Sequence, residues 1–455
     1  MTILKKRLAI STTHIILLSF LTVIFIGSFL LWLPISHKSG VEVNYLDSLF
    51  ISTTSTCVTG LVTLITADTW SIFGQIIILL LIQIGGLGVI TVFAGILVFL
   101  HKKFSLKDSQ LIQDSFNIND SGGINKFVQK VIIGSLIIEL IGALLYMIVF
   151  IPDFGAKGIW ISIFTSISAF CNAGIDIIGS VSLIDYATNP IINTVTSLLI
   201  ILGGLGFIVW WDLLRVLKTF KTKKFRCFNS LTLHTKLVLF ITFILVFAGG
   251  LLIFIFEFNN PNTIGNLNIF DKIQVSLFQS ITTRTAGFIS IPQEDLTTTS
   301  TIICIILMFI GGSPVGTAGG IKTVTFIVLI ISAISTIRNK NEVVIFNRTL
   351  SKESTRKALA IFTMSLLIVI ISTLLLSIAM PNTSVVDLLY ETVSATATVG
   401  LSRNLTMSLN GFGKLIIIVT MYLGRVGPIS LAVAFNLERK IDNIIKYPVE
   451  EIRVG

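Results

Sequence analysis

The sequence contains the same local pattern four times at an almost constant interval. Each copy ends in a short tract of small residues or threonine with one glycine, and successive glycines lie 114, 113 and 113 residues apart. These glycines are Gly60, Gly174, Gly287 and Gly400. Self-similarity at a fixed period is typical of repeat architectures, so we predict a fourfold tandem array.

Each copy consists of a long apolar run, a short amphipathic stretch, the glycine tract and a second long apolar run. The first runs lie near 14–34, 127–151, 236–257 and 357–380, and the second runs lie near 70–100, 191–217, 299–336 and 413–437. The short stretches lie near 45–57, 158–171, 268–283 and 384–397. These stretches are too short to cross a bilayer, but their length suits re-entrant helices.

Two spans in each copy return the chain to the same side of the membrane, so the copies are parallel and their re-entrant segments converge on one axis. We therefore predict an all-α polytopic membrane protein. It has four tandem helix–pore helix–filter–helix (M1-P-M2) repeats around one central pore and eight transmembrane helices. The predicted boundaries are 1–115, 116–225, 226–345 and 346–437 for the repeats and 438–455 for a cytoplasmic C-terminal tail.

Composition supports a membrane protein. Of the 455 residues, 53% are hydrophobic and only 12% are charged, whereas soluble domains carry about 25% charged residues. The first apolar run approaches the length of a span and ends at Pro34 without a small-residue cleavage pattern. We therefore expect a first transmembrane helix there and not a signal peptide.

The basic residues are distributed unevenly along the chain. Of the 33 lysines and arginines, 25 lie near the N-terminus, between the repeats or in the tail. The positive-inside rule then predicts a multi-pass protein of the plasma membrane with cytoplasmic N- and C-termini. The opposite face carries mostly acids, which either attract cations or merely keep short loops hydrated. We exclude nucleic acid as a partner, because the basic residues lie between apolar runs and not on one aqueous face.

The glycine tracts are the candidate functional site. Non-helical backbone at membrane depth is tolerated only where it is buried in protein or lines a wet cavity, and free carbonyl groups there can replace the hydration shell of potassium. Glycines used only for helix packing would lie within the long runs, as in IQIGGLG and ILGGLGF, where we expect packing and bending. The predicted potassium-binding filter residues are Val58, Thr59, Gly60, Asn172, Ala173, Gly174, Thr285, Ala286, Gly287, Thr398, Val399 and Gly400.

These motifs resemble those of the Trk/Ktr/HKT superfamily of potassium transporters, and most closely the KtrB-type membrane subunit. The resemblance covers essentially the whole chain and rests on TCVTGL, FCNAGI, TTRTAGF, TATVGL, IQIGGLG, SLTLHTKL, GGSPVGTAGGIK and YLGRVGP. It implies one filter glycine in each repeat. Family members with serine at the first of these positions tend to be sodium-permeable, so Gly60 implies potassium selectivity.

The resemblance also implies partners and ions. It implies a homodimer on a cytosolic KtrA-like nucleotide-binding ring that responds to ATP and ADP. Potassium is the transported ion, activation by sodium is allowed for, and no organic cofactor is expected in this chain. The basic cytoplasmic loops fit docking of such a ring, but they equally fit the positive-inside topology alone.

A second irregular segment interrupts the second run of the third repeat. Five glycines and a proline cannot continue an α-helix there, so the segment forms a loop or merely a broken helix. It lies about 24 residues beyond Gly287, near mid-membrane, and the resemblance implies the intramembrane gate of the family. The predicted gate residues are Gly311, Gly312, Ser313, Pro314, Val315, Gly316, Thr317, Ala318, Gly319, Gly320 and Arg425.

Three basic residues fall outside the loops, and an intramembrane charge is by default a functional hypothesis. We expect Arg425 to contact carbonyl groups of the gate loop and hold it closed. For Arg284 the simplest expectation is a pair with an outer acid that braces the filter. For Lys322 we expect the side chain to snorkel toward the cytoplasm.

Two alternatives to permeation through a channel-like filter require other residues. An ion-coupled alternating-access symporter, using sodium or protons, needs buried acids, and the candidates are Glu139, Asp212, Glu257 and Glu391. A membrane-embedded enzyme needs His, Asp or Cys clustered at helical spacing, and the four histidines are scattered. We therefore expect that the protein is not an enzyme.

Overall fold

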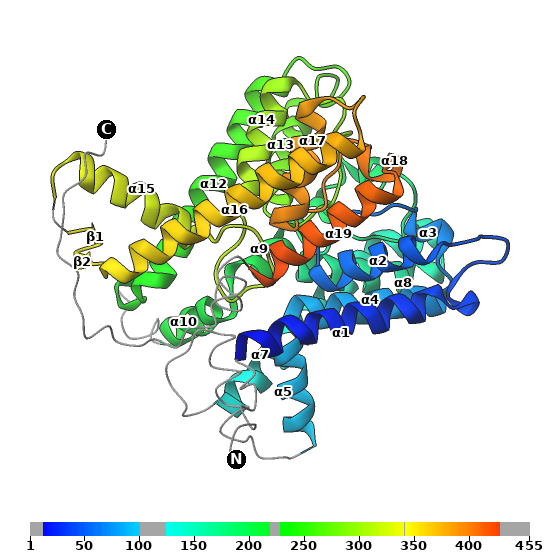
Figure 1. The fold of residues 1–455 in the computed structure, drawn as a ribbon, viewed down its shortest axis with the longest axis horizontal. Helices are drawn as coiled ribbons and strands as arrows, with labels where there is room; N and C mark the ends of the chain where they lie inside the picture. Colours follow the sequence, from blue (N-terminus) through cyan, green and yellow to red (C-terminus); the bar gives the residue numbers. More distant parts are fainter. Residues whose placement is uncertain (1–11, 101–123, 219–227, 341, 428–455) are drawn as a thin grey trace, which may run out of the picture.

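The computed structural model describes residues 12–100, 124–218, 228–340 and 342–427, and these ranges are mostly helical (Figure 1). The predicted boundaries at 115 and 225 and the tail 438–455 lie outside the described residues. The boundary at 345 falls in a two-stranded antiparallel hairpin of β1 (Val344–Ile345) and β2 (Arg348–Thr349). The secondary structure of the described residues is therefore helical as predicted, except for this short hairpin.

Four long apolar helices form the frame of the molecule. They are α1 (Thr12–Trp32), α7 (Ile124–Phe154), α12 (Leu233–Glu257) and α16 (Lys352–Ala379). Among the described residues these four are long and apolar enough to cross a membrane, and the number rises to six if two bent helix pairs each count as one span. Eight spans therefore stay a prediction.

A shorter helix follows each long helix and contacts it. These helices are α2 (Tyr45–Cys57), α8 (Lys157–Cys171), α13 (Ile269–Thr282) and α17 (Val385–Ala397). All four agree with the predicted stretches to within a residue. Side-chain caps set two of the starts: Asn268 accepts the Asp271 amide at 2.9 Å, and Ser384 accepts the Asp387 amide at 3.1 Å.

The second apolar runs of the first two repeats are bent at their GGLG motifs, where the sequence predicted packing and bending. The helices α4 (Ile72–Leu87) and α5 (Val89–Phe99) meet at 97°, and α9 (Pro190–Leu205) and α10 (Phe207–Leu217) meet at 98°. Gly88 and Gly206 form the bends, each with a φ of 89°. A left-handed φ suits glycine because no Cβ clashes, so these glycines permit the sharp turn.

The second runs of the other two repeats differ from each other. In the third repeat, α14 (Thr298–Phe309) and α15 (Thr323–Ile337) are separated by the irregular segment; in the fourth, α19 (Gly411–Val426) is followed by Gly427, with a φ of 86°. Short helical turns complete the described structure: η1 (Pro34–Ser36), α3 (Thr66–Thr69), η2 (Ile184–Tyr186) and α18 (Leu405–Ser408).

Contacts between the copies close into a ring. The helices α4, α9, α14 and α19 contact α8, α13, α17 and α2 respectively, so the last copy contacts the first (Figure 1). At the junction of the last and first copies, Lys414 Nζ lies 2.5 Å from Asp47 Oδ1, and the Thr63 hydroxyl donates to the same oxygen at 2.8 Å. The short helices and the tracts that follow them are thereby held inside the ring.

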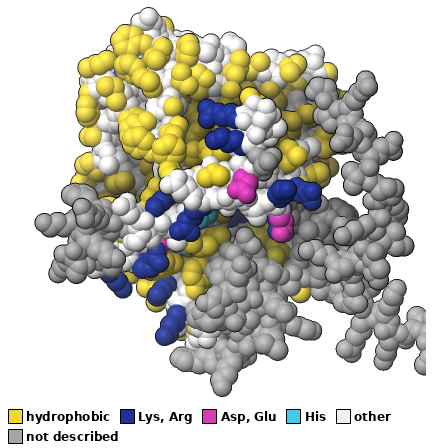
Figure 2. Space-filling model, turned by 90° about the vertical axis from the view of Figure 1, so that its left-hand side faces the viewer, with side chains coloured by type: hydrophobic (Ala, Val, Ile, Leu, Met, Phe, Trp, Pro, Cys, Tyr) yellow, Lys and Arg dark blue, Asp and Glu magenta, His cyan; other side chains and the backbone are white. Residues whose placement is uncertain are grey.

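The outer surface fits a membrane-embedded protein. Figure 2 shows hydrophobic side chains over most of the upper part of one face, with Lys and Arg side chains gathered in its middle and lower part. Basic residues are exposed at the hairpin and in the first turns of α16, among them Arg348, Lys352 and Arg356. Large apolar side chains such as Phe29 and Leu140 are more than half exposed on the long helices, as expected where lipid replaces water.

Candidate functional site

Each glycine tract begins with a residue in the left-handed conformation. The φ angles are 55° at Val58, 59° at Asn172, 64° at Thr285 and 51° at Thr398. The tract glycines also have positive φ, between 64° and 101°. A β-branched residue with positive φ is rare and strained, and such strain persists only where the surrounding structure enforces it, commonly at functional sites.

The preceding helix holds the amide groups of each tract. The amides of Thr59, Ala173 and Val399 each donate at 2.8 Å to a carbonyl near the end of that helix. Side-chain hydroxyls hold further amides, since Thr54 accepts from Gly60 at 2.9 Å and Ser394 accepts from Gly400 at 3.1 Å. Among the described residues, no carbonyl oxygen of the twelve tract residues accepts a hydrogen bond. The tracts therefore keep these carbonyl groups available for another ligand.

The third tract is built differently from the others. Relative to the tract glycine, its helix ends at Thr282, two residues earlier than its counterparts, and the Ala286 amide donates to the Thr282 carbonyl at 3.0 Å. The Thr282 hydroxyl donates to the Phe288 carbonyl at 2.7 Å. In the first and fourth repeats, by contrast, the hydroxyls of Thr54 and Ser394 accept from glycine amides. Arg284 directly precedes this tract.

The four tracts face one another across a common centre. A Cβ on Gly60 would lie 2.5 Å from the Ala173 carbonyl oxygen. In the same way, Cβ atoms on the other three glycines would clash with the carbonyl oxygens of the next tract, namely Ala286, Val399 and Thr59 in turn. The contacts pass from each tract to the next and return to the first. The absence of a side chain at these four positions therefore allows the backbones to meet around one axis.

A cavity of about 130 Å³ lies on one side of this ring, and all four glycines line it. A second and larger cavity of about 370 Å³ lies on the other side of the irregular segment. Gly88, Lys322 and Arg425 line this second cavity together with apolar residues of α1 and α16. We name them the outer and the inner cavity, following the predicted orientation.

The segment 311–320 is a compact loop whose ends meet. Ile310 and Ile321 form a β-bridge, and the Gly312 amide donates to the Gly319 carbonyl at 3.3 Å. The loop docks on the bend between α9 and α10. Two of its amides donate to carbonyls of α9, from Ser313 at 2.9 Å and from Thr317 at 3.1 Å, while the Phe207 amide donates to the Val315 carbonyl at 3.0 Å.

The loop also touches two of the filter tracts. The Thr317 hydroxyl lies 3.1 Å from Asn172 Oδ1 and 3.2 Å from the Phe170 carbonyl oxygen. A Cβ on Gly319 would clash with the Thr398 hydroxyl. The loop therefore lies directly against the second and fourth tracts and separates them from the inner cavity.

Two cations hold adjacent carbonyl groups of the loop. Arg425 Nη1 donates to the Thr317 carbonyl at 2.6 Å, and its Nη2 donates to the Gly85 carbonyl at 2.5 Å. The predicted contact of Arg425 with the loop is therefore present, and the guanidinium ties the loop to α4. Lys322 Nζ donates to the Ala318 carbonyl at 2.7 Å. The prediction that Lys322 snorkels to the cytoplasm is wrong, because its ammonium bonds back to its own loop.

Comparison with known proteins identifies the family. The profile of the TrkH family, described as cation transport protein, matches residues 5–447. The chain belongs to the TrkH family. The resemblance found in the motifs of this TrkH-family chain is thereby confirmed.

Curated TrkH-family relatives match over their full length. The chain is 38% identical to the potassium/sodium uptake protein NtpJ of Enterococcus hirae, covering 100% of both chains. It is also 38% identical to the Ktr system potassium uptake protein B of Bacillus subtilis, covering 99% of this chain and 98% of that one. These relatives are transporters and not enzymes.

A solved structure shows the fold. The potassium transporter TrkH of Vibrio parahaemolyticus superposes with a TM-score of 0.73 at 16% identity, covering 95% of this chain and 86% of that one. At that identity the likeness establishes the fold alone. The chain therefore has the helical, membrane-type transporter fold of TrkH.

The prediction for Arg284 is wrong in this TrkH-family chain. No acid lies within 4 Å of its guanidinium in the described ranges, and its buried Nε has no hydrogen-bond partner there. The side chain lines a small void with Thr242 and Gly312, and its carbonyl accepts from Asn172 Nδ2 at 3.4 Å. The sequence could not reveal this, because neighbours from α9 and α12 decide what surrounds Arg284.

Local partners engage the four acids considered for ion coupling. Glu139 accepts from Gln83 at 3.0 Å, and Asp212 lies 2.6 Å from Arg215. Glu257 accepts from the Thr297 hydroxyl at 2.7 Å, and Glu391 accepts from the Ser402 hydroxyl at 2.7 Å. None of the four lines the outer or the inner cavity. Their contacts are those of structural braces between neighbouring segments.

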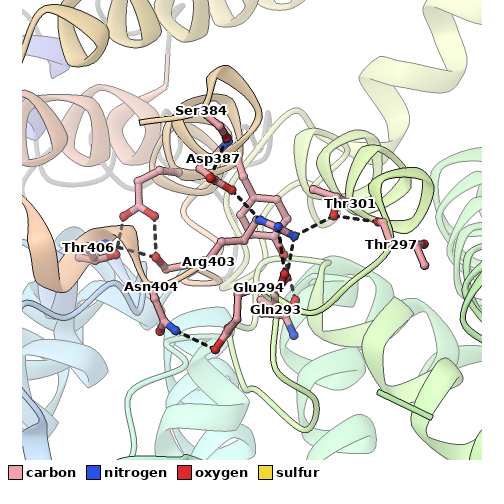
Figure 3. Close-up of polar contacts among 12 residues, drawn as sticks. Gln293, Glu294, Thr297, Thr301, Ser384, Asp387, Arg403, Asn404 and Thr406 are labelled. Atoms are coloured by element: carbon pink, nitrogen blue, oxygen red, sulfur yellow. Dashed lines mark hydrogen bonds and ion pairs between the residues drawn. The ribbon is translucent and has the colours of Figure 1, made fainter. Parts of the chain in front are cut away.

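One polar cluster was not predicted from the sequence, and it joins the segments that follow the third and fourth tracts (Figure 3). Arg403, three residues after Gly400, lies with its Nε 2.7 Å from Asp387 Oδ1. Its Nη1 donates to the Gln293 carbonyl at 2.8 Å and to the Thr301 hydroxyl at 2.9 Å. The sequence signal was an arginine on the face otherwise rich in acids, but its partners Gln293 and Thr301 lie more than 100 residues away.

Proposed function

We propose that this protein takes up potassium across the plasma membrane through a channel-like selectivity filter formed by the twelve tract residues. The closed ring of four glycines, each facing a carbonyl of the next tract, carries the proposal. Because the tract amides bond to their own helices, the carbonyl groups remain free to replace the hydration shell of a monovalent cation. The names of the relatives, a potassium/sodium uptake protein and a Ktr system potassium uptake protein, support potassium as the ion and sodium as a second ion.

The proposed architecture is four M1-P-M2 repeats around this one pore, with eight transmembrane helices and boundaries at 115, 225, 345 and 437. The ring of contacts from α4, α9, α14 and α19 to the next short helix supports it. Each bent pair then counts as one spanning segment, as does the interrupted pair α14 and α15. The exposed basic residues at the hairpin and α16 support cytoplasmic termini, because they lie between the third and fourth repeats.

The segment 311–320 serves as the gate in this proposal, and Arg425 is its latch. The loop lies against two filter tracts and borders the inner cavity, so an ion that leaves the filter meets it first. Arg425 stabilises this position through two charge-assisted hydrogen bonds to different elements. Its positive charge also opposes cations in the closed pore.

Regulation follows from the Ktr relatives. We propose a homodimer that docks on a cytosolic KtrA-like ring, whose response to ATP and ADP moves the gate loop, with sodium as an activator. The Bacillus subtilis relative is named as protein B of a Ktr system, which supports a separate regulatory subunit. The bend in α9–α10 carries the loop contacts, so motion at this bend would reach the gate.

The test is cation uptake by the purified full-length chain in liposomes with an imposed gradient. We expect uptake of 86Rb⁺ competed by external K⁺ and much less by Na⁺. Gly287→Ser should lower this selectivity, because its Cβ would clash with the Val399 carbonyl and distort the ring. Gly411→Ser is the matched control, since only Leu46 Cδ2, at 3.7 Å, lies near its Cβ position and Gly411 lines neither cavity.

Two results would contradict the proposal. Equal competition by K⁺ and Na⁺ in the wild-type protein would exclude a potassium-selective filter. Rb⁺ accumulation that requires a sodium or proton gradient would favour the coupled symporter. In that case Glu139→Gln should abolish the coupling, because Glu139 is a buried acid within a long apolar helix.

A further inference from the structure

Among the described residues that line the outer cavity, one has a charged side chain. It is Asp176, which follows Gly174 by two positions, and the rest are the four tract glycines, apolar residues and neutral polar residues. An ion that enters the filter from this side passes through a space of about 130 Å³ that Asp176 borders. The carboxylate therefore lies beside the proposed entrance of the filter.

The chain holds this carboxylate in place with neutral donors. The Ser182 hydroxyl donates to Oδ2 at 2.5 Å, and the Ile178 amide donates to Oδ1 at 3.2 Å. The Leu183 amide ties the same loop to the third repeat by donating to the Ile289 carbonyl at 3.0 Å. Within the described ranges, no Lys, Arg or His nitrogen lies within 4 Å of the Asp176 carboxylate. Its negative charge is therefore not neutralised by the protein.

The other acids of the outer face are neutralised or lie elsewhere. Asp47 pairs with Lys414, and Asp387 pairs with Arg403. Glu294 accepts from Asn404 at 2.7 Å. None of these acids lines the outer cavity. Of the described acids on this face, Asp176 is therefore the one whose carboxylate lies at the proposed filter entrance.

We propose that Asp176 captures the incoming monovalent cation at the outer mouth and raises its occupancy at the first filter carbonyl groups. This inference rests on the proposed function and assigns the residue that sets apparent affinity for the ion. An uncompensated charge in a narrow cavity with low-dielectric walls raises the local concentration of counter-ions. Because no basic side chain of the described residues pairs with Asp176, a cation from solution neutralises its charge.

The energetics of the carboxylate agree with this assignment. Burial raises the pKa of Asp176 above its usual range, while Ser182 and the backbone amides of Ile178 and Gly179 oppose that rise. A bound cation would supply the missing stabilisation of the charged form. Ser182 adopts a φ of 53°, which is an uncommon conformation for serine and orients its hydroxyl in this loop.

The experiment compares Asp176→Asn with Asp185→Asn in the full-length protein in liposomes. Both variants remove one acid from the same loop, but Asp185 is exposed and does not line the cavity. A unit charge about 8 Å from a cation, in an effective dielectric of about 40, changes the binding constant of that cation about five-fold. We expect Asp176→Asn to raise the KM for 86Rb⁺ uptake by about that factor with little change in the maximal rate. Asp176→Glu should restore most of the affinity, and Asp185→Asn should behave like the wild type.

A binding measurement separates this inference from the proposed function. The purified wild-type protein should melt at a higher temperature in Rb⁺ than in the same concentration of N-methylglucamine. Asp176→Asn should require about five-fold more Rb⁺ for the same rise in melting temperature. If the wild type takes up no Rb⁺ at all, the proposed function fails, and the melting titration still decides the role of Asp176. Equal Rb⁺ dependence of wild type and Asp176→Asn, in uptake or in melting, would overturn the role of Asp176 alone.

Discussion

Replacement of Arg425 by alanine should open the pore in the absence of any partner. The guanidinium donates to the Thr317 carbonyl in the gate loop and to the Gly85 carbonyl in α4. A hydrogen bond to a charged group contributes about 1.5–3 kcal/mol, and the freed carbonyls recover part of that by binding water in the inner cavity. We take about 2–4 kcal/mol for the two together. At about 1.4 kcal/mol per factor of ten, the equilibrium between docked and displaced loop shifts roughly 30- to 1000-fold.

A shift of this size changes which loop position is populated. Minor conformers of a two-state element commonly hold about 0.1–10% of the population. A displaced loop that holds about 1% of the wild-type molecules should therefore rise to about a quarter or more of them in Arg425→Ala. In liposomes that contain only the purified chain, the initial rate of 86Rb⁺ uptake should rise at least about eight-fold over wild type.

Two further variants separate the latch from a simple charge barrier. Arg425→Lys keeps the charge but can reach only one of the two carbonyl groups, so a latch predicts an intermediate rate. Arg425→Gln removes the charge, and a pure charge barrier would make it as fast as Arg425→Ala while Arg425→Lys stayed at the wild-type rate. Arg348→Ala, at an exposed arginine of the hairpin, is the control for loss of a basic residue. An unchanged rate in a correctly folded Arg425→Ala protein would refute the latch.

Three other predictions concern the framework of the filter. Gly85→Ala should lower the melting temperature, with a loss of about 1–3 kcal/mol or more in the free energy of unfolding, because its Cβ would clash with the Thr56 carbonyl. An unchanged melting curve would contradict the close approach of α4 to α2. Arg403→Ala should destabilise by about 2–4 kcal/mol through the loss of four hydrogen bonds. Asp387→Asn should cost less, because the ion pair is partly exposed, and equal melting shifts for the two variants would argue against the carbonyl contacts of Arg403. Glu139→Gln should leave the rate and the ion dependence of uptake unchanged in a channel-like protein, since Gln83 can still donate to the amide oxygen; loss of uptake in a folded variant would point to coupling.

The repeat period and the lengths of the apolar runs predicted a large part of the fold. The four long helices and the four short helices lie where the sequence places them, to within a few residues. Hydrophobic length is a local property, so a stretch of 13–15 residues is recognised as too short for a span wherever it lies. Bending was expected at the GGLG motifs, but its size was not, because glycine allows a slight bend as well as the bends of 97° and 98° that the structure contains.

Side-chain partners were predicted less well than backbone elements. The contact of Arg425 with the gate loop was expected, but its second contact with Gly85 was not. Arg284 was expected to find an acid and has none in the described ranges, and Lys322 was expected to leave its loop and does not. Helices from other repeats provide the Gly85 contact of Arg425 and part of the surroundings of Arg284, whereas Lys322 bonds to Ala318 within its own loop.

The sequence by itself determined that this chain is a membrane protein of four similar units, each with one glycine tract after a short helix. Those conclusions depend on composition, run length and period, which can be read along the chain. Only the tertiary structure decided which carbonyl group each tract glycine meets, that the segment 311–320 lies against two of the tracts, and that Asp176 lines the cavity beside the four glycines. The physical reason is that these contacts join residues about a hundred positions apart, and the packing of whole helices sets their distance.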